Sequence, residues 1–455
     1  MSRAGDLGGH MVKAAKFGGS SLADAVQFQK VRDIVCADDT RRVVVVSAPG
    51  KRHGGDNKVT DLLYLCHAHL QYGVSCESVF AMIEDRFRDI QQGCGIPADL
   101  APEFACIRGS MRKGMPIDEL VSRGEYLTAK LMAAYLGFDF VDAADWVTFG
   151  YDGKLDAPRS EQRLRELLAE HPRMVVPGFY GALPNGKLRL LSRGGSDITG
   201  SLAAAAADAA VYENWTDVSG VLMADPRVVP NPKPIPHITY GELRELAYMG
   251  ANVLHEEAVF PVRQINIPIN IRNTNAPDEA GTLICEHFDR ETHEERARFI
   301  TGISGHTGFS IITLRKSRLA AEPGALRSAL AVFEQFGVPV EHIPGGIDSF
   351  SPVVSSEQAA PVLYDILGEL HRCCAPDSLT VTDNIALIAV VGRKMASLPG
   401  VSGKIFGALG AHNVNIRMIA QGPDEINIIV GVENGDFEKA IRILYNSFVI
   451  GGSGQ

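Results

Sequence analysis

The chain has 455 residues, more than one domain usually holds, so its length predicts two or three domains that each bury a core. Hydrophobic residues make up 45% of the chain and charged residues 22%, as in soluble globular proteins, and no apolar stretch is long enough to cross a bilayer. The net charge of −10 disfavours sequence-independent binding to nucleic acid, so we expect small-molecule partners and neither a nucleic acid nor a membrane partner.

The cysteines bear on the compartment. Eight of them are scattered from Cys36 to Cys374 without CxxC spacing, which predicts neither a zinc site nor a disulfide framework. The adjacent pair Cys373 and Cys374 is typical of reduced residues, and we expect a cytoplasmic protein.

A glycine-rich run, Lys16-Phe17-Gly18-Gly19-Ser20-Ser21, lies between an apolar stretch at 12–15 and a predicted helix at 23–35. Adjacent glycines let backbone N–H groups approach a polyphosphate, and the helix N-terminus behind them adds a favourable dipole. Lys16 supplies a positive charge. The run is not a Walker A sequence, and an ordinary Gly-Ser turn explains it equally well when it is taken alone.

The N-terminal part has the pattern of a doubly wound α/β domain, because short β-branched runs alternate with longer Ala- and Leu-rich segments. Residues 42–47 predict a buried parallel strand that ends in Ala48-Pro49-Gly50. Open α/β sheets bind ligands beyond the carboxyl ends of such strands, so we expect a site there. Residues 51–57, with two glycines and mixed charge, predict a mobile flap before a helix that begins near Thr60.

Two polar clusters precede predicted helices. Glu125 immediately precedes the predicted helix at 126–136, where it would either favour the helix dipole or hold a substrate ammonium. Residues 192–197 lie between a predicted strand and a helix at 198–210, and Arg193 offers the planar fork that binds a carboxylate. This second cluster indicates an anion site, with a Gly-Gly hairpin capped by Asp197 as the alternative.

A third cluster, Trp215-Thr216-Asp217-Val218-Ser219-Gly220, is followed by a proline-rich loop that contains Arg227 and runs to Pro236. Loops of this kind often embrace a nucleotide base and ribose. Proline-rich surface loops without function are also common, so both interpretations stay open.

An internal repeat follows Thr282. Residues 324–343 align with residues 400–419, and each copy predicts a strand, a glycine-led helix, a second strand and a hairpin into a third. That plan is a βαββαβ ferredoxin-like unit used twice. The repeats carry no catalytic cluster, which indicates a dimerisation module, an amino-acid sensor or both.

Together the clusters suit phosphorylation of a carboxylate. Two glycine loops would bind anions, a lysine would neutralise transferred charge, an arginine would bind a carboxylate and a glutamate would bind an ammonium. The substrate would then be an amino acid. No metal-ligand spacing is evident, so we predict no protein metal site, and the Mg²⁺ used with ATP would be carried chiefly by the nucleotide phosphates.

The order of the motifs resembles that of aspartokinase over nearly the whole chain from Val12. The motifs are Lys16-Phe17-Gly18-Gly19-Ser20, Val46-Ser47-Ala48, Arg123-Gly124-Glu125, Ser192-Arg193-Gly194-Gly195-Ser196-Asp197 and Trp215-Thr216-Asp217-Val218-Ser219-Gly220. The resemblance implies an amino-acid-kinase α/β three-layer sandwich with a mainly parallel sheet at 12–290, then two ferredoxin-like ACT domains at 298–380 and 384–450. It also implies that ATP phosphorylates the β-carboxylate of L-aspartate to 4-phospho-L-aspartate, the entry to lysine, threonine, methionine and diaminopimelate synthesis.

The same resemblance assigns roles to single residues. The implied catalytic residues are Lys16, Asp197 and Arg193, with Asp197 orienting Lys16. The residues implied around the nucleotide are Lys16, Phe17, Gly18, Gly19, Thr216, Asp217, Arg227, Asn252 and Val253. The residues implied around aspartate are Ser47, Thr60, Glu125, Arg193, Gly194, Gly195 and Ser196. Within this set Arg193 would bind the α-carboxylate and Glu125 the ammonium.

Two positions depart from the family pattern. Asn252 stands where many members have a lysine near the phosphates, so a transition-state cation is missing or replaced. Leu222 stands where a tyrosine is often seen, which weakens any expectation of base stacking there.

The first repeat suggests an effector pocket. Its expected lining is Gly324, Ala325, Leu326, Val340, Glu341 and Asp348, with the helix N–H groups facing an amino-acid carboxylate. Glu341 and Asp348 favour lysine over threonine as the effector, although both carboxylates would equally suit a solvated surface. We further expect a homodimer or a dimer of dimers through the ACT domains.

Two other functions remain open. One is a kinase for another acidic amino acid, such as glutamate or N-acetylglutamate, against which the two ACT-like repeats count. The other is a catalytically silent amino-acid-binding regulator, which Asn252 keeps open.

Overall fold

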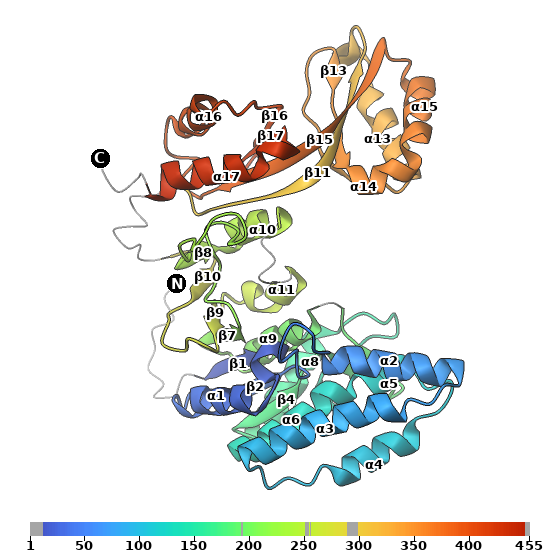
Figure 1. Cartoon of the computed structure of the whole chain (residues 1–455), viewed down its shortest axis with the longest axis vertical. Helices are drawn as coiled ribbons and strands as arrows, with labels where there is room; N and C mark the ends of the chain where they lie inside the picture. Colours follow the sequence, from blue (N-terminus) through green and yellow to red (C-terminus); the bar gives the residue numbers. More distant parts are fainter. Residues whose placement is uncertain (1–11, 193, 251–253, 255, 289–298, 451–455) are drawn as a thin grey trace. The chain divides into compact units, whose positions relative to one another are not determined.

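The structure is a computed structural model that describes residues 12–192, 194–250, 254, 256–288 and 299–450. The chain forms two compact units (Figure 1). The first unit contains Met1–Val221, Pro236–Thr239 and Asn252–His287, and the second contains Leu222–Ile235, Tyr240–Ala251 and Phe288–Gln455. Two internal segments of the expected kinase range of 12–290, and its end from Phe288, therefore belong to the second unit.

The first unit is built on an eight-stranded sheet with the order β3-β4-β2-β1-β7-β9-β10-β8. Its strands are β1 (Lys13–Phe17), β2 (Arg41–Val46), β3 (Asp139–Phe140), β4 (Met174–Pro177), β7 (Val211–Thr216), β8 (His237–Thr239), β9 (Ile269–Asn273) and β10 (Thr282–Cys285). Every neighbouring pair is parallel except β9 with β10. The mainly parallel sheet predicted from the alternating pattern is thus confirmed.

Helices cover both faces of this sheet because its central strands are apolar on both sides. The four valines of β2 are fully buried, and alternation along the strand sends Val44 and Val46 to one face and Val43 and Val45 to the other. The first pair joins the core beneath α1 (Ala25–Cys36), α3 (Glu77–Cys94) and α6 (Arg123–Leu136). On the other face α9 (Gly195–Ala206) contacts β1 and β2 and packs with α8 (Ala157–Glu170) and α11 (Glu256–Gln264). These are the three layers that the resemblance implied.

Shorter elements complete the first unit. The remaining helices are α2 (Val59–Tyr72), α4 (Ala101–Ser110), α5 (Ile117–Val121) and α7 (Ala143–Trp146). A separate antiparallel pair is formed by β5 (Tyr180–Ala182) and β6 (Leu188–Leu190). No helix in the described ranges of either unit has the length and apolar character needed to span a membrane.

The second unit contains a seven-stranded sheet with the order β12-β14-β11-β15-β17-β16, and β13 also pairs with β11. Its strands are β11 (Gly302–Arg315), β12 (Val340–His342), β13 (Ser349–Phe350), β14 (Val353–Ser355), β15 (Ser378–Val391), β16 (Met418–Ala420) and β17 (Asn427–Glu433). Its helices are α10 (Tyr240–Tyr248), α13 (Ala325–Gln335), α14 (Ser356–Ala359), α15 (Leu363–Cys374), α16 (Val401–Ala411) and α17 (Phe437–Tyr445). Both copies of the predicted repeat are present, with α13 and α16 each led by a glycine.

The two repeats share their longest strands. β11 pairs with β15 at both of its ends. Its half from Phe309 to Arg315 also pairs with β13 and β14 of the first repeat, and its other half, from Gly302 to His306, pairs with residues 387–391 of β15. The same residues of β15 also pair with β17 of the second repeat. The expected boundary at 380–384 therefore falls inside β15, and the repeats form one continuous sheet.

Candidate active site

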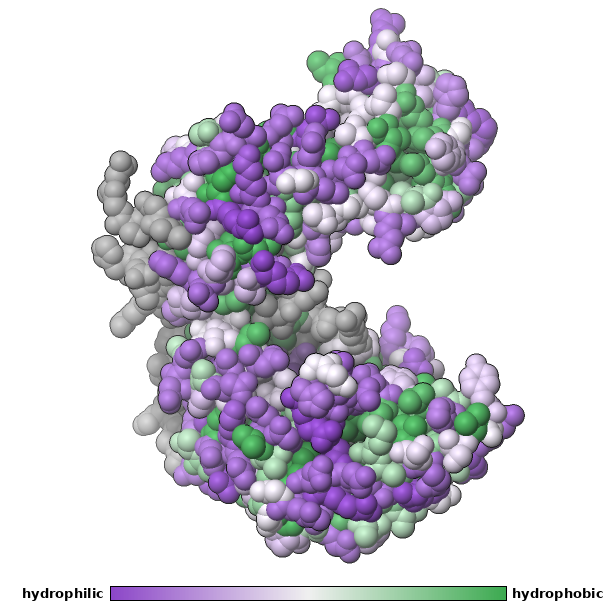
Figure 2. Space-filling view, in the orientation of Figure 1, coloured by the Kyte–Doolittle hydropathy of each residue, from purple (hydrophilic) through white to green (hydrophobic). Residues whose placement is uncertain are grey.

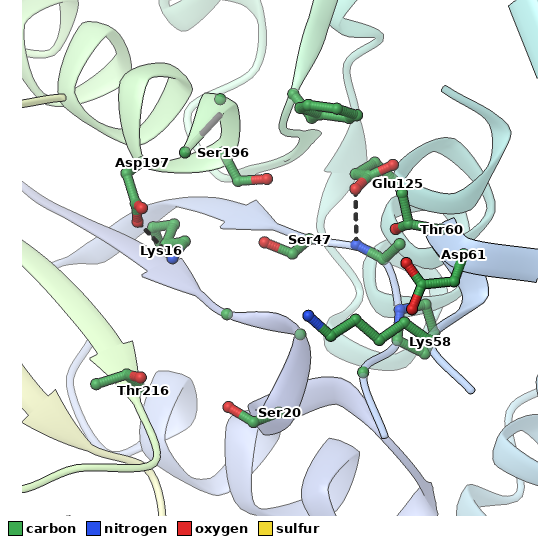
Figure 3. A pocket seen from close by; sticks show the side chains of 18 of the residues that line it. Lys16, Ser20, Ser47, Lys58, Thr60, Asp61, Glu125, Ser196, Asp197 and Thr216 are labelled. Atoms are coloured by element: carbon green, nitrogen blue, oxygen red, sulfur yellow. Dashed lines mark hydrogen bonds and ion pairs between the residues drawn. The ribbon is translucent and has the colours of Figure 1, made fainter. Parts of the chain in front are cut away.

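A cavity of about 830 Å³ opens in the first unit where β1 and β2 end, the edge of the sheet at which a site was expected (Figure 3). Twelve of the predicted site residues line it: Lys16, Gly18, Gly19, Ser47, Thr60, Glu125, Gly194, Gly195, Ser196, Asp197, Thr216 and Asp217. Residues expected at the nucleotide and residues expected at aspartate thus surround one space.

The glycine loop after β1 packs against the loop after β2. The N–H of Gly18 donates to the carbonyl of Trp215 at 3.0 Å, and the N–H of Gly50 donates to the carbonyl of Gly19 at 2.8 Å. A Cβ on Gly50 would lie 2.7 Å from the carbonyl carbon of Gly19, so a side chain there would force the two loops apart. Glycine is needed in this wall because of the close backbone approach.

Lys16 is held by partners on α9 and β7. Its Nζ lies 2.5 Å from Oδ1 of Asp197 and donates to Oδ1 of Asn214 at 3.3 Å. Asn214 in turn donates from Nδ2 to Oδ1 of Asp197 at 2.9 Å. Asp197 is therefore in contact with the lysine that the resemblance expected it to orient, and Figure 3 shows this ion pair at the edge of the cavity.

Only one of the two carboxyl oxygens of Glu125 has a hydrogen-bond partner among the described residues. Glu125 is buried in the first turn of α6, where Oε1 accepts a hydrogen bond from the N–H of Ala48 at 3.1 Å (Figure 3). Oε2 is also buried and has no hydrogen-bond partner among the described residues. Burial raises the pKa of the Glu125 carboxyl to about 8. A group in this state is suited to a cationic partner, which would satisfy the free oxygen and restore the charge.

The second glycine loop leads into α9. Gly194 caps this helix with a φ of +81°, and a Cβ on Gly195 would lie 2.7 Å from Cδ2 of Phe179. The helix starts at Gly195, earlier than expected, so Asp197 lies in its first turn and is not its cap. It ends at Ala206 instead of residue 210, and Asp208, with a φ of +46°, turns the chain before β7 begins at Val211. Arg193 lies outside the described residues.

Several predicted residues lie elsewhere. Phe17 is fully buried and stacks on Trp215 with ring centroids 5.9 Å apart, so its side chain does not line the cavity. Arg227 belongs to the second unit, where its guanidinium is 2.6 Å from Asp225. Asn252 and Val253 lie outside the described residues. The nucleotide roles of these residues stay predictions.

The predicted effector residues do not share one cavity in the second unit. Glu341 accepts a hydrogen bond from the Tyr248 hydroxyl and lines a cavity of about 320 Å³ with it. Asp348 instead accepts a hydrogen bond from the N–H of Arg318 at 2.8 Å. The predicted residues that do not line the Glu341 cavity are Gly324, Ala325, Leu326, Val340 and Asp348.

The segment at 51–57, expected to be a mobile flap, is held at its two ends by one arginine. Buried Arg86, on α3, lies 2.6 Å from Oδ2 of Asp56 and donates to the carbonyl of Gly50 at 2.8 Å. Hydrogen bonds from Arg52, with the Arg86 charge nearby, hold the pKa of Asp56 well below its usual range. No sequence signal pointed to Arg86, because its partners are distant along the chain.

Other cavity residues were also missed. Phe179 has a φ of +77°, rare for a residue with a side chain, and its N–H donates to Oγ1 of Thr199 at 3.1 Å. The start of α2 contributes Lys58, Asp61 and Tyr64, of which Tyr64 could have been found from its i, i+4 spacing to the predicted Thr60.

Two carboxylates of the cavity suit a cation carried by ATP. Asp61 and Asp217 line the cavity without an ion pair to any residue in the described ranges. Over those same ranges, no cluster of three or more His, Cys, Asp or Glu side chains could itself hold a metal ion. These features fit Mg²⁺ bound mainly by phosphates, with a carboxylate nearby.

Comparisons with known proteins agree with this geometry. The sequence model of the amino acid kinase family matches residues 11–273, and that of the ACT domain matches residues 388–448. Aspartokinase 3 of Bacillus subtilis is 36% identical over 458 residues, with 97% of this chain and 99% of the relative covered. 

Solved structures give the same result. The crystal structure of Clostridium acetobutylicum aspartate kinase matches with a TM-score of 0.88 and 46% identity, covering 96% of this chain and all of the other. Two structures of E. coli aspartokinase III match at 25% identity over 96% of this chain. One, in complex with aspartate and ADP, has a TM-score of 0.73 and is covered completely, and the other, with lysine and aspartate, has a TM-score of 0.72 and is 99% covered. The chain therefore belongs to the aspartokinase family and is an aspartate kinase with a C-terminal ACT region.

Proposed function

We propose that the cavity binds ATP over the glycine loop and L-aspartate beside Glu125, and that it transfers the γ-phosphoryl group to the β-carboxylate. The observation that carries this proposal is the free Oε2 of Glu125 in the same cavity as the Lys16 and Gly18 wall. A cation-binding point and an anion-binding wall in one space suit a zwitterionic amino acid next to a polyphosphate. The E. coli relative crystallised with aspartate and ADP supports the pairing.

The transfer requires positioning and charge stabilisation. An oxygen of the β-carboxylate forms a bond to the γ-phosphorus while the bond to the bridging oxygen breaks, and that electron pair leaves with ADP. Lys16, oriented by Asp197, would stabilise the charge on the transferred group, and Arg193 would hold the α-carboxylate. Mg²⁺ bound to the nucleotide would neutralise phosphate charge, and the cavity-lining carboxylates of Asp61 and Asp217 are the candidates to assist its binding.

A hydroxamate assay with ATP, Mg²⁺ and a panel of acidic amino acids tests the substrate. We expect product with L-aspartate. A preference for glutamate or N-acetylglutamate would assign the chain to another acceptor, and no product with any amino acid would make it a silent regulator.

Lysine is the proposed feedback effector, acting through the ACT region. Glu341 offers a carboxylate to its ammonium, and the E. coli relative was crystallised with lysine in the T-state. An effector can inhibit only by binding two conformations with different affinities. Inhibition by lysine but not by threonine would support this choice.

A homodimer, or a dimer of dimers, is proposed through the first repeat, which exposes large apolar side chains. Figure 2 shows apolar surface over α13 and α15. Tyr364 on α15 is 86% exposed and Ile347 is 79% exposed. Large apolar side chains gathered on one surface are typical of a protein–protein interface. Light scattering of wild type and Tyr364→Glu would test the dimer.

We also propose that the enzyme acts in the cytoplasm, at the entry to lysine, threonine, methionine and diaminopimelate synthesis.

A further inference from the structure

The described part of the cavity holds three lysines, and they differ in their partners. Lys16 is 2.5 Å from the carboxylate of Asp197, so this pair contributes no net charge. Lys51 and Lys58 form no ion pair with any residue that the structure describes. ATP and aspartate both bring negative charge to the point of transfer, so a cation not already neutralised by the protein has a clear use there.

The backbone of Lys58 is firmly held although its side chain is exposed. Lys58 is the N-cap of α2, and its carbonyl accepts a hydrogen bond from the N–H of Leu62 at 3.1 Å. The next residue, Val59, is fully buried and donates to the carbonyl of Pro49 at 3.0 Å. Arg86 also donates to the carbonyl of Asn57, just before Lys58. The backbone that carries this side chain is therefore fixed at the wall of the cavity.

The direction of the Lys58 side chain places its charge between the two substrate walls. In Figure 3 the ammonium points into the cavity, toward the space bounded by Ser20 of the glycine loop and Ser47. The glycine loop would hold phosphates, and Ser47 lies on the side where Glu125 would hold aspartate. The γ-phosphoryl group and the β-carboxylate must meet in this space.

We propose that Lys58 is a catalytic residue of the phosphoryl transfer, an inference that rests on the proposed function. Its ammonium contacts oxygens of the γ-phosphoryl group and of the β-carboxylate as the new O–P bond forms. The bond from the phosphorus to the bridging oxygen breaks, and its electron pair leaves with ADP. Lys58 keeps its proton throughout and acts by stabilising the shared negative charge.

The test compares Lys58→Met with Lys58→Arg, Lys51→Met and the exposed surface variant Lys113→Met. Removing one preorganised charge contact usually lowers kcat by about 10²- to 10³-fold, and we expect this loss for Lys58→Met. Affinity for ADP alone should change much less, whereas affinity for ADP–aluminium fluoride with aspartate should fall in parallel with kcat. Lys58→Arg should restore part of the rate, and Lys113→Met should match wild type.

Three results would overturn the proposal. The first is a kcat of Lys58→Met equal to that of the wild type. The second is an affinity of Lys58→Met for ADP that falls as much as its kcat. The third is a loss of rate in Lys51→Met and none in Lys58→Met. Far-UV circular dichroism checks that each variant is folded. A wild-type enzyme inactive with aspartate would instead remove the proposed function, so the two failures are distinguishable.

Discussion

Glu125 and Ala48 are 77 residues apart in the chain, yet Oε1 of Glu125 accepts the N–H of Ala48 at 3.1 Å. This hydrogen bond joins the start of α6 to the loop after β2 and fixes the carboxyl group in the cavity. The other oxygen has no partner among the described residues, so one half of the group is anchored and the other half is available to a ligand.

Aspartate binding should release a proton from Glu125. Burial raises its pKa to about 8, so the ligand-free group is mostly protonated at pH 7, whereas a bound ammonium favours the carboxylate. Calorimetry in two buffers of different ionisation enthalpy would count this proton, and affinity for aspartate should rise from pH 6 to pH 8. Glu125→Gln should abolish the proton release and raise the KM for aspartate by about 10- to 100-fold, the loss of one charged hydrogen bond. The exposed variant Glu170→Gln is the control.

The same group should make the ligand-free enzyme less stable as pH rises. Its pKa in the folded state is above the ordinary glutamate value of 4.5, so between pH 4.5 and pH 8 the folded state binds more protons than the unfolded state. The free energy of unfolding should therefore fall across this window, and less so in Glu125→Gln. Both tryptophans of the chain, Trp146 and Trp215, are buried in the first unit, so their fluorescence in urea reports this unit. A pH slope that is equal in both proteins would contradict the assigned burial effect.

Lys16→Ala should lower kcat by about 10²- to 10³-fold, with smaller changes in KM, because a cation on the transferred group acts mainly in the transition state. Asp197→Asn should lower kcat less, since it leaves Lys16 present but poorly oriented. Steady-state kinetics with ATP and aspartate would measure both. Near-normal turnover of Lys16→Ala would make this lysine structural and would require another cation.

Arg86→Met should destabilise the first unit by about 1.5–3 kcal/mol, because Asp56 and the carbonyl of Gly50 lose a charged hydrogen-bond donor while Arg52 still binds Asp56. Urea unfolding followed by tryptophan fluorescence measures this change. Arg88→Met, on the exposed face of the same helix, should change stability by less than about 1 kcal/mol. Because the pKa of Asp56 is lowered in the fold, its contribution is present at neutral pH and lost as the solution is acidified. Equal effects of the two arginine variants would show that the loop is not held by Arg86.

Glu341→Ala, made alone and combined with Asp348→Ala, should weaken inhibition by lysine, because a cationic effector in the Glu341 cavity would lose its carboxylate partner, whereas Asp348 lies outside that cavity. The change should raise the lysine concentration for half inhibition by about 10-fold or more for one lost charge contact. Activity without lysine should be unchanged. Undiminished inhibition would remove both residues from the effector site, and a wild type insensitive to lysine would end the lysine proposal.

Local patterns in the sequence predicted the layers of the fold well. Three features could be predicted from neighbouring residues alone: the buried valines of β2, the glycine loop after β1 and the glycine-led helices of the repeats. Hydrophobic period, β-branching and glycine act over a few neighbouring residues, so each of these patterns is visible in the sequence. The site was predicted where motifs lie at strand or helix ends, as for Lys16, Glu125 and Asp197.

Contacts between distant segments were not predictable in this way. Arg86 reads as one of many charged residues on a helix, and only the fold brings it under the loop that contains Asp56. Phe179 looks like a core aromatic until its positive φ and its place in the cavity are known. The pairing of β11 with β15 across the two repeats could not be predicted either, because a sequence repeat does not show which copy a strand pairs with.

The shared strands limit how this regulatory region could be exchanged between relatives. A chimera that imports the first repeat alone, with junctions near residues 298 and 380, would import Gly302–His306 and cut β15 close to its start at Ser378. A foreign strand would then have to pair with Leu387–Val391 of the second repeat. These residues are buried, so the match would have to be close. Junctions outside β11 and after α17 avoid this mismatch, so effector specificity should be transferable as a whole region more readily than repeat by repeat.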